Sequence, residues 1–368
     1  MNMKILLVNS FDKTGGSTIR MRRFYKFLCE LGYDVIYVES NSDLREQNVI
    51  SIRQQNTPIG FLIGTLKRII LVLKIKYDIL FIQKLVPFTV PIIFIAKLFN
   101  KKIIVDFDDW DSLLQKSYVI KYLCSLSENL FYNFPDVYIT PHKYLRTLLQ
   151  KKTNKKIYII PQGIDTELFN PNKYDKYELR KIFNLPLDSK IIGFVGCFTP
   201  AGVGEFEKIL LSVKKIIDND KNVYFLVIGG GRLLDYYKDF CNKIGIKNVI
   251  FTDTLQHNEI PKYIAVCDVM TIWMRDLIGD YFKGTLKIVE YLCMNKPVVG
   301  VLVGETENSF GKYCIKSLPT VESFVQCLYK ALSKDTTKQY LYYDLIKENY
   351  SFETGKNLLQ KIIEEVIK

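Results

Sequence analysis

Short runs of consecutive apolar residues alternate along the chain with longer segments whose apolar positions recur every three or four residues. The short runs are continuous in Val, Ile, Leu and Phe, which is typical of parallel strands covered on both faces. In the first half we expect strands over 4–8, 34–38, 78–83, 102–107, 136–140 and 156–160. In the second half we expect strands over 190–196, 222–228, 248–252, 268–273 and 297–301.

Helical periodicity fills the gaps between these runs, for example over 18–31, 205–217, 232–244 and 285–295. Strand, helix and strand repeated at this spacing predict a doubly wound α/β fold. Because the series occurs twice, we expect two Rossmann-like domains that face a central cleft. We expect the boundary between them in the polar segment 161–171.

Length and composition agree with two globular domains. The chain has 368 residues, of which 48% are hydrophobic and 24% charged, and a domain typically takes about 150 residues. The net charge is +12, and residues 1–170 hold 24 basic and 15 acidic residues, a net of +9. This basic half predicts either an anionic partner or a solvated basic face. The stretches 65–76 and 86–97 are compatible with peripheral association with an anionic membrane, and equally with ordinary helices packed on the sheet.

The cysteines, the histidines and the longer apolar runs bear on the compartment of the protein, on metal sites and on membrane insertion. Eight scattered cysteines without a Cys-x-x-Cys pair predict reduced thiols in a cytoplasmic protein. Two histidines are too few for a histidine-rich metal site. The apolar run at the start is too short for a signal peptide. The stretch 86–99, interrupted by two prolines and a lysine, is too short for a membrane span.

Parallel sheets bind ligands beyond the carboxyl ends of their strands, so the loops there are the places to search for chemistry. After the first strand come Gly15, Gly16 and Ser17, followed by a helix. Such a loop fits an acceptor or phosphate, or a tight turn with a capping residue. Arg20 lies off the apolar stripe of this helix together with neighbouring bases. We expect these bases either to meet a phosphate or anionic lipid or, more simply, to face water.

A second loop holds four acids in six residues: Asp106, Asp108, Asp109 and Asp111. Carboxylates at a strand end can hold a sugar hydroxyl, a metal ion or a proton. Helix capping and first-turn acids are the alternative. Four carboxylates so close together repel one another, which makes capping alone a poor explanation.

A third segment, 280–299, places Lys283, Lys287 and Glu290 on one helix face at 100° per residue. The helix begins just past a strand, so its N-terminus lies at the ligand edge. The free amides at Gly284 and Thr285, together with two lysines, suit a diphosphate, and the glutamate could accept hydrogen bonds from a ribose. The alternative is a Lys–Glu surface pair at helical spacing.

The glycine run 229–231 closes another strand and permits a close backbone approach there. As a sequence signal it is weak, because any tight strand-to-helix turn can have this composition.

These segments resemble the retaining glycosyltransferases of the GT-B fold, family 4, and within them a subgroup with an Asp-x-Asp-Asp signature. The resemblance rests on TGGSTIRMRRFYKFLCELGYDVIYVES, IIVDFDDW, YIIPQGIDTELFNP, VIGGG, HNEIPKYIAVCDVMTIW and KGTLKIVEYLCMNKPVVG. It implies an acceptor-binding domain over 1–168 and a nucleotide-sugar-binding domain over 169–350. It also implies that a helix over 351–368 packs back towards the first domain.

The resemblance further implies a nucleotide-sugar donor, a glycan or lipid-linked acceptor, retention of anomeric configuration, and neither a metal nor another cofactor. Glu290 matches the ribose-binding glutamate of the family, and Gly229 and Gly230 would join the donor site. Phe282 stands where the family has a second glutamate. The usual basic pair after the strand that opens the second domain is absent, which leaves the hydroxyl of Thr199.

With that basic pair absent, Lys283 and Lys287 are the expected phosphate ligands. His142 does not match the acceptor-domain histidine of the family, and we expect it to be structural.

In such a transfer the departing diphosphate takes the acceptor's proton on one face of the sugar. The protein stabilises charge and aligns the acceptor. Asp106, Asp108 and Asp109 are the expected catalytic residues, which would orient acceptor or donor hydroxyls rather than bind metal. A non-catalytic GT-B partner or membrane scaffold is the main alternative, and a nucleotide-sugar epimerase of related fold is a weaker one. We expect no nucleic-acid partner, because no recognised nucleic-acid-binding module occurs.

Overall fold

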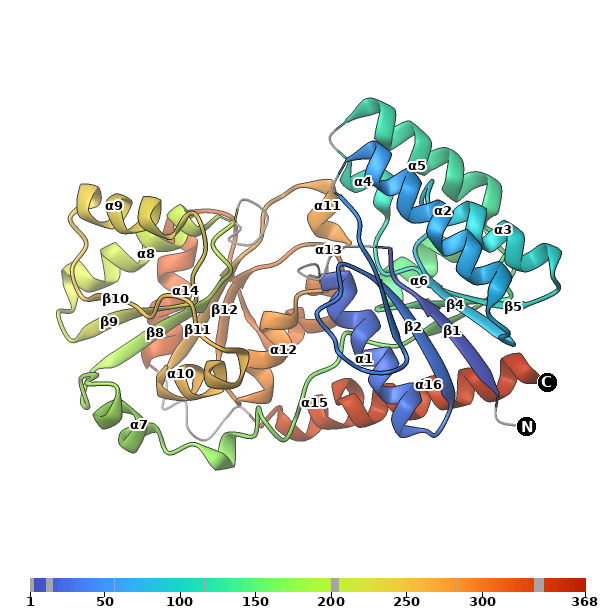
Figure 1. Ribbon diagram of the computed structural model, residues 1–368. Helices are drawn as coiled ribbons and strands as arrows, with labels where there is room; N and C mark the ends of the chain where they lie inside the picture. The colour runs from blue at the N-terminus through green and yellow to red at the C-terminus, as the bar shows by residue number, and fades with distance from the viewer. Residues whose placement is uncertain are drawn as a thin grey trace. The chain divides into compact units, whose positions relative to one another are not determined.

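The computed structural model describes residues 3–10, 16–55, 57–115, 117–199, 205–282, 284–333 and 341–368. The chain forms two compact units (Figure 1), one made of Met1–Gln162 and Glu353–Lys368 and the other of Gly163–Phe352. The division falls a few residues before the expected boundary at 168/169, because Ile164 bridges Ser351 and Phe169 is buried in the core of the second unit.

The first unit is built on a seven-stranded sheet with strand order β3-β2-β1-β4-β5-β6-β7. All of its strand pairs are parallel. Its strands are β1 (Lys4–Val8), β2 (Asp34–Ser40), β3 (Val49–Ile52), β4 (Ile79–Gln83), β5 (Lys102–Asp106), β6 (Val137–Thr140) and β7 (Lys156–Ile159). The sequence pattern did not predict the edge strand β3, which is short and only partly buried.

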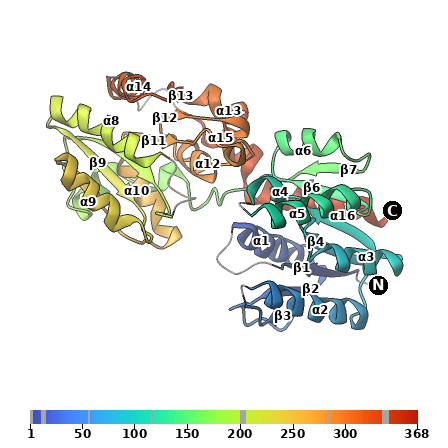
Figure 2. The same cartoon turned by 90° about the horizontal axis from the view of Figure 1, so that it is seen from above.

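The helices of the first unit are α1 (Gly16–Glu30), α2 (Pro58–Lys74), α3 (Val90–Leu98), α4 (Asp111–Leu114), α5 (Tyr118–Phe131), α6 (Lys143–Gln150) and α16 (Phe352–Ile367). One side of the sheet carries α2, α3 and α5, and the other carries α1 and α16 (Figures 1 and 2). The C-terminal helix α16 lies next to α1, where Lys356 Nζ is 3.3 Å from Glu30 Oε2.

The second unit contains a six-stranded parallel sheet with strand order β10-β9-β8-β11-β12-β13. Its strands are β8 (Lys190–Val195), β9 (Val223–Ile228), β10 (Val249–Phe251), β11 (Val269–Trp273), β12 (Val298–Val301) and β13 (Ile315–Lys316). Its α-helices are α7 (Lys176–Ile182), α8 (Phe206–Asn219), α9 (Leu234–Ile244), α10 (Ile260–Val266), α11 (Ile278–Tyr281), α12 (Leu286–Cys293), α13 (Gly304–Phe310), α14 (Val321–Ser333) and α15 (Tyr343–Tyr350). Short 3-10 turns lie at Pro171–Lys173, His257–Glu259 and Gly311–Tyr313.

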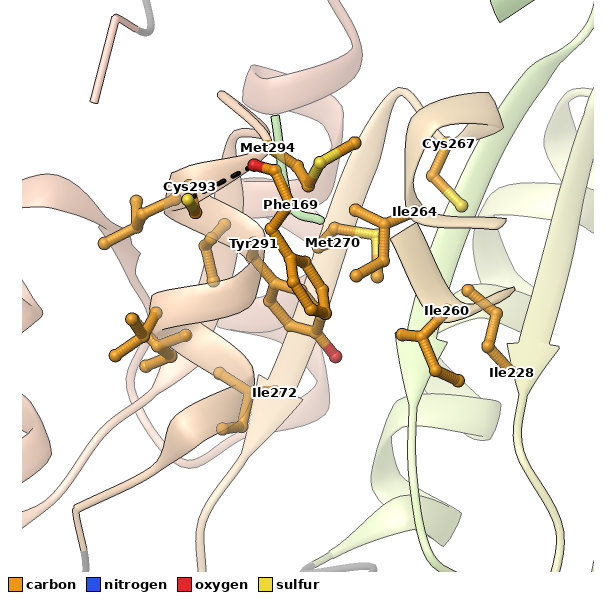
Figure 3. Packing of buried hydrophobic residues seen from close by; sticks show 14 of the residues in the cluster. Phe169, Ile228, Ile260, Ile264, Cys267, Met270, Ile272, Tyr291, Cys293 and Met294 are labelled. Atoms are coloured by element: carbon orange, nitrogen blue, oxygen red, sulfur yellow. Dashed lines mark hydrogen bonds between the residues drawn. The ribbon is translucent and has the colours of Figure 1, made fainter. Parts of the chain in front are cut away.

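Buried side chains of the second unit form two clusters, one on each face of the sheet. Met270 and Ile272 of β11 belong to one cluster, whereas Val269 and Trp273 belong to the other. Because neighbouring residues of a strand point to opposite faces, a continuous apolar run supplies both clusters. Figure 3 shows the first cluster, in which Phe169 packs beside α10 and α12. The predicted doubly wound α/β class, with two Rossmann-like domains, is confirmed.

Candidate functional site

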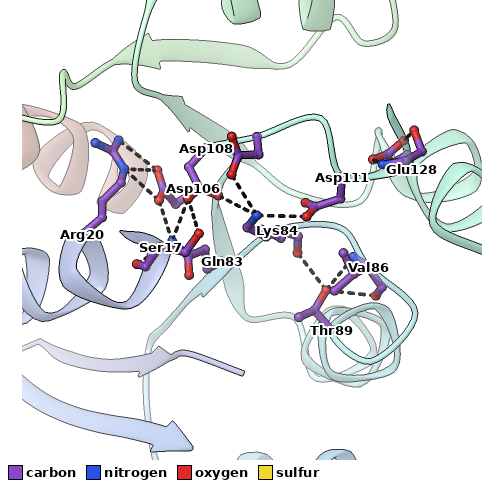
Figure 4. Close-up of polar contacts among 12 residues, drawn as sticks. Ser17, Arg20, Gln83, Lys84, Val86, Thr89, Asp106, Asp108, Asp111 and Glu128 are labelled. Atoms are coloured by element: carbon purple, nitrogen blue, oxygen red, sulfur yellow. Dashed lines mark hydrogen bonds and ion pairs between the residues drawn. The ribbon is translucent and has the colours of Figure 1, made fainter. Parts of the chain in front are cut away.

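A buried ion pair connects helix α1 to the carboxyl end of β5 (Figure 4). Arg20 donates from Nε and Nη2 to the Asp106 carboxylate over 2.9–3.1 Å. It also donates to the carbonyl oxygens of Ile160, at 2.9 Å, and Pro161, at 3.2 Å. The exposed fraction is 1% for Arg20 and 0% for Asp106. The expectation that this arginine faces water is therefore wrong, because its guanidinium ties α1 to β5 and to the segment that follows β7.

Lys84 lies at the centre of the remaining carboxylates. It follows β4 in a left-handed backbone conformation, with φ of 67°. Its Nζ is 2.9 Å from an oxygen of Asp111, 3.2 Å from one of Asp109 and 3.6 Å from one of Asp108. This lysine was not predicted, although it comes directly after a fully buried strand, where ligand-edge residues are expected.

Burial and mutual repulsion control the protonation of this cluster. Burial would lower the pKa of Lys84, but the three carboxylates around it raise that pKa well above its usual value. Burial raises the pKa of Asp111 to about 7, outweighing the attraction of Lys84, and the charges of Asp108 and Asp109 add to the rise. Burial raises the pKa of Asp106 to about 6 against the pull of Arg20. The site therefore holds protonatable carboxyl groups near neutral pH.

Ser17 and Gln83 complete the site. Ser17 Oγ donates to Asp108 Oδ2 over 2.7 Å, and Gln83 Nε2 donates to the Ser17 carbonyl oxygen over 2.9 Å. Ser10 Oγ, Gln83 Oε1 and Asp108 Oδ1 are buried polar oxygens to which the structure gives no hydrogen-bond partner. Buried polar atoms are usually paired, and Asp108 Oδ1 does face Lys84 Nζ at 3.6 Å.

The residues predicted for this site differ in their access to a ligand. The Asp109 side chain is 30% exposed, whereas that of Asp108 is only 3% exposed. Gly16 begins α1, and Gly15 lies outside the described residues. His142 caps α6, where its Nδ1 accepts a hydrogen bond from the Leu145 amide over 3.2 Å.

In the second unit, helix α12 packs against the carboxyl end of β8. The Val195 amide donates to the hydroxyl oxygen of Tyr291 over 2.9 Å. Lys287 Nζ lies 5.0 Å from the centre of the Phe194 ring. The loop that follows β8 contains Thr199, which is partly exposed. The structure therefore places Lys287 at the carboxyl end of β8. Thr199 lies in the loop that follows this strand end.

The glycine run after β9 makes a close approach to the chain itself. A Cβ on Gly229, whose φ is +116°, would lie 2.2 Å from the carbonyl oxygen of Gly196. A Cβ on Gly230 would lie 2.2 Å from Thr254 Oγ1. The Phe198 amide donates to the carbonyl oxygen of Gly230 over 2.9 Å. These glycines therefore allow two strand-end loops to pack together, a reason that the sequence pattern alone did not reveal.

Glu290 lies on α12 and is 5% exposed. Its Oε1 is 3.4 Å from Nε2 of His257, whose side chain is 63% exposed. The sequence analysis did not single out His257 as a site residue, although it lies in the loop segment that follows β10. A buried carboxylate beside an exposed imidazole forms a polar position suited to a hydroxyl-bearing ligand.

The N-terminus of α12 is partly open. Gly284 is exposed, and Thr285 takes the N-cap position without making a side-chain capping bond. Thr285 Oγ1 instead lies 3.1 Å from Thr306 Oγ1. Phe282, which replaces the second glutamate of the resembled family, is 8% exposed. Lys283 lies outside the described residues.

A separate pocket of about 490 Å³ lies at the carboxyl ends of β11 and β12. Its lining includes Lys208, Trp273 and Arg275, and the last of these is held by Asp280 over 3.0 Å. Neither Lys287 nor Glu290 belongs to the lining. The sequence analysis did not anticipate this pocket, because its walls come from side chains far apart along the chain.

Comparison with known families identifies the class of protein. Residues 14–168 match the family model described as Glycosyltransferase Family 4, and residues 189–334 match the one described as Glycosyl transferases group 1. The two matches together span most of the chain. Each of these two segments therefore carries a domain of a glycosyltransferase family.

The relatives with similar sequences are distant from this chain. TuaC of Bacillus subtilis, assigned as a glycosyltransferase of teichuronic acid biosynthesis, is 24% identical over 206 residues, 54% of this chain and 48% of the relative. A GDP-mannose-dependent alpha-(1-6)-phosphatidylinositol monomannoside mannosyltransferase of Mycobacterium tuberculosis is 25% identical over 114 residues, 31% of this chain and 29% of the relative. The chain thus spans about half the length of the first relative and less of the second.

Solved structures share the fold over the whole chain. Sucrose-phosphate synthase from Thermosynechococcus elongatus superposes with a TM-score of 0.78 at 15% identity, covering 100% of this chain and 99% of that chain. Anabaena Alr3699/HepE, solved in complex with UDP and glucose, gives a TM-score of 0.73 at 16% identity, covering 99% of this chain and 100% of that chain. These neighbours confirm the predicted GT-B fold.

Proposed function

We propose that this chain is a retaining glycosyltransferase that moves a sugar from a nucleotide-sugar onto a glycan or lipid-linked acceptor. The observation that carries the proposal is Glu290, a buried carboxylate on the helix that starts beyond β11. The domain families support it, as do relatives named for teichuronic acid and phosphatidylinositol mannoside chemistry. We place the reaction in the synthesis of a cell-surface polysaccharide or glycoconjugate.

In this proposal the second unit binds the donor. The open N-terminus of α12, at Gly284 and Thr285, offers amides to the diphosphate. Lys287, in the first turn beside the end of β8, adds a positive charge. Glu290 lies about one turn further along and accepts hydrogen bonds from the ribose hydroxyls. Lys283 would add a second positive charge to the diphosphate site.

The first unit binds the acceptor in the same proposal. Asp109, the more exposed carboxylate, and Asp108, which is largely buried, orient acceptor hydroxyls. Asp106 and Arg20 are fully buried and hold this loop in place. The ammonium group of Lys84 offsets the repulsion between the carboxylates of Asp108 and Asp109.

The chemistry needs no protein nucleophile. The bond between the anomeric carbon and the diphosphate oxygen breaks, and the acceptor oxygen bonds to the same face of the sugar. The acceptor's proton passes to the departing diphosphate, whose charge is stabilised by lysine and backbone amides. Alignment and charge stabilisation are the two contributions asked of the protein.

Isothermal titration with a nucleoside, its monophosphate and its diphosphate tests the donor site. Lys287→Ala should weaken binding of the diphosphate more than that of the nucleoside, and Glu290→Ala should weaken both alike. Hydrogen bonds to charged groups contribute roughly 1.5–3 kcal/mol, so each loss should reduce affinity by about one to two orders of magnitude. Glu178→Ala, on the exposed surface of α7, is the matched control and should bind like the parent.

Two results would change the proposal. If both variants bind all three ligands like the parent, this helix face is only a surface and the donor site is misplaced. If the parent neither binds nucleotides nor turns over any donor, the chain is the non-catalytic partner or scaffold that Phe282 also allows. Retention is tested separately by NMR of the product anomer, and an inverted product would overturn that part alone.

A further inference from the structure

Helix α2 presents its apolar side to solvent. The residues on its buried side are mostly small or polar: Gly60, Gly64, Thr65, Arg68 and Val72. Beside Lys67 and Lys74, its outer side exposes six aliphatic residues at 46–71%: Ile59, Leu62, Ile63, Leu66, Ile70 and Leu73. A surface helix of a soluble domain normally has the reverse arrangement, with its apolar stripe facing the core.

Close packing and polar contacts hold α2 in this orientation. A Cβ on Gly60 would lie 2.3 Å from the carbonyl oxygen of Gln55, so this side must lie against the chain. Arg68 is 1% exposed and donates to Gln54 Oε1 at 2.9 Å and Ser40 Oγ at 2.5 Å. Turning the apolar side inward would break these contacts.

Helix α5 repeats the arrangement. Its buried residues are Cys124, Ser127 and Glu128, and the carboxylate of Glu128 accepts from the amide and the hydroxyl of Ser112 at 3.1 and 2.5 Å. Its outer side also carries Lys121 and Asn129, and its large apolar residues there are 42–89% exposed: Tyr118, Val119, Ile120, Tyr122, Leu123, Leu126 and Leu130.

Helix α3 adds further exposed apolar residues on the same side of the sheet, as Figures 1 and 2 show for the three helices. These are Phe94 and, at and just past its end, Leu98 and Phe99. We call the exposed apolar residues of α2, α3 and α5 named here the apolar face. It holds sixteen of the twenty-eight large exposed hydrophobic residues in the described part of the chain. Contiguous exposed patches of this kind mark interaction sites.

The exposed charged residues on α2 and α5 are lysines, and on α3 Lys97 pairs with Asp136 over 3.0 Å. Residues 57–77 contain no acidic residue, and Lys67, Lys74 and Lys76 are exposed there. On α5, Lys121 is exposed and the one acid, Glu128, is buried. Helices with an apolar side and flanking lysines lie in the headgroup region of anionic bilayers, and tyrosines are enriched at that depth. No described helix is both long and apolar enough to pass through a bilayer.

We propose that the apolar face docks the first unit onto an anionic lipid bilayer, with α2 and α5 lying in the headgroup region. A second copy of the chain is a poorer occupant, because a two-fold interface brings the same surface of both copies together and would oppose lysine to lysine. The inference goes beyond the proposed transfer reaction and does not depend on it. If both hold, the acceptor site lies on a unit that is anchored beside lipid-linked acceptors.

Co-sedimentation of the full chain with lipid vesicles tests this docking. The parent should bind vesicles of phosphatidylcholine and phosphatidylglycerol, with weaker binding at high salt. The double variant Leu66→Glu, Ile70→Glu should bind at least about tenfold more weakly, because two side chains that enter the bilayer become charged. Ile182→Glu, at an exposed position on α7 that is 67% exposed, should bind like the parent.

A second pair of substitutions tests the contribution of charge. Lys67→Gln with Lys74→Gln should reduce the preference for anionic over neutral vesicles. Tyr122→Glu with Leu126→Glu on α5 repeats the apolar test, and circular dichroism confirms that each variant is folded. The proposal is overturned if the parent binds no vesicles or if both apolar variants bind like the parent. It is also overturned if light scattering shows a parent dimer that these variants convert to monomers, since a second copy would then cover the apolar face.

Discussion

At the residue scale, the buried charges of the first unit do not balance. Lys84 faces Asp108, Asp109 and Asp111 within 2.9–3.6 Å, so one ammonium meets three carboxylates. Burial raises the pKa of Asp111 to about 7 against the attraction of Lys84, and the charges of Asp108 and Asp109 add to the rise. Proton uptake by this cluster is therefore coupled to folding near neutral pH.

This coupling predicts how stability changes with pH. A carboxyl group whose pKa is raised on folding stabilises the protein at low pH, and this contribution is lost as the pH rises through the folded-state value. Between pH 6 and 8 the free energy of unfolding should fall by at least about 1 kcal/mol. Asp111→Asn should make this dependence shallower, as measured by urea unfolding at several pH values.

Asp34→Asn provides the control for this prediction, because Asp34 makes only a partly exposed pair with Lys4. It should leave the pH dependence between pH 6 and 8 unchanged. A slope in Asp111→Asn equal to that of the parent would show that another group takes up the proton.

Residue contacts also separate the two roles within the acidic loop. Asp106 is sealed behind Arg20 and cannot meet a ligand without a rearrangement of α1. Asp109, with a 30% exposed side chain, can do so directly. The sequence gives no reason to assign different roles to Asp106 and Asp109. Their different partners and burial in the structure separate the two roles.

At the scale of elements, the loops after β8 and β9 pack closely against each other at Gly229. Gly229 combines a φ of +116° with a position where a Cβ would lie 2.2 Å from the carbonyl oxygen of Gly196. Gly229→Ala should therefore reduce the free energy of unfolding by at least about 2 kcal/mol, through backbone strain and overpacking. Thermal or urea unfolding measures the loss.

Gly245→Ala is the matched control. Gly245 ends α9 with a φ of +67°, and a Cβ there would meet no atom of the described residues within 4 Å. Its substitution should cost only about 1 kcal/mol, from the left-handed backbone. Equal losses in the two variants would mean that the backbone conformation alone, and not the packing of the two loops, explains Gly229.

At the scale of the whole molecule, the proposed transfer predicts no need for a divalent metal ion. In that proposal, lysine side chains and the amides that begin α12 stabilise the negative charge of the leaving diphosphate. Hydrolysis of the donor, measured as the amount of nucleoside diphosphate released, should continue unchanged in EDTA. Complete loss in EDTA with rescue by magnesium or manganese would instead give the aspartates of the first unit a role in metal binding.

Much of the architecture follows from the order of residues. Strand β1 occupies the expected residues 4–8, and β5 and β9 differ from expectation by a single residue. Buried parallel strands leave uninterrupted apolar runs, which is why they are visible in the sequence. The edge strands β3 and β13 were not predicted, because they are short and partly exposed and their stability comes from a neighbouring strand.

What the sequence by itself determined is the alternation of strands and helices, the two-domain α/β class and the clustering of acids after β5. The tertiary structure alone decided that Arg20 turns inward to Asp106, 86 positions away along the chain, and that Lys84 lies among the acids. It also decided that α2 turns Gly60 and Arg68 inward and its leucines outward. Periodicity records only the spacing of side chains along one element. Which side of a helix is buried, and which charges become partners, depends on segments that the fold brings together from distant parts of the chain.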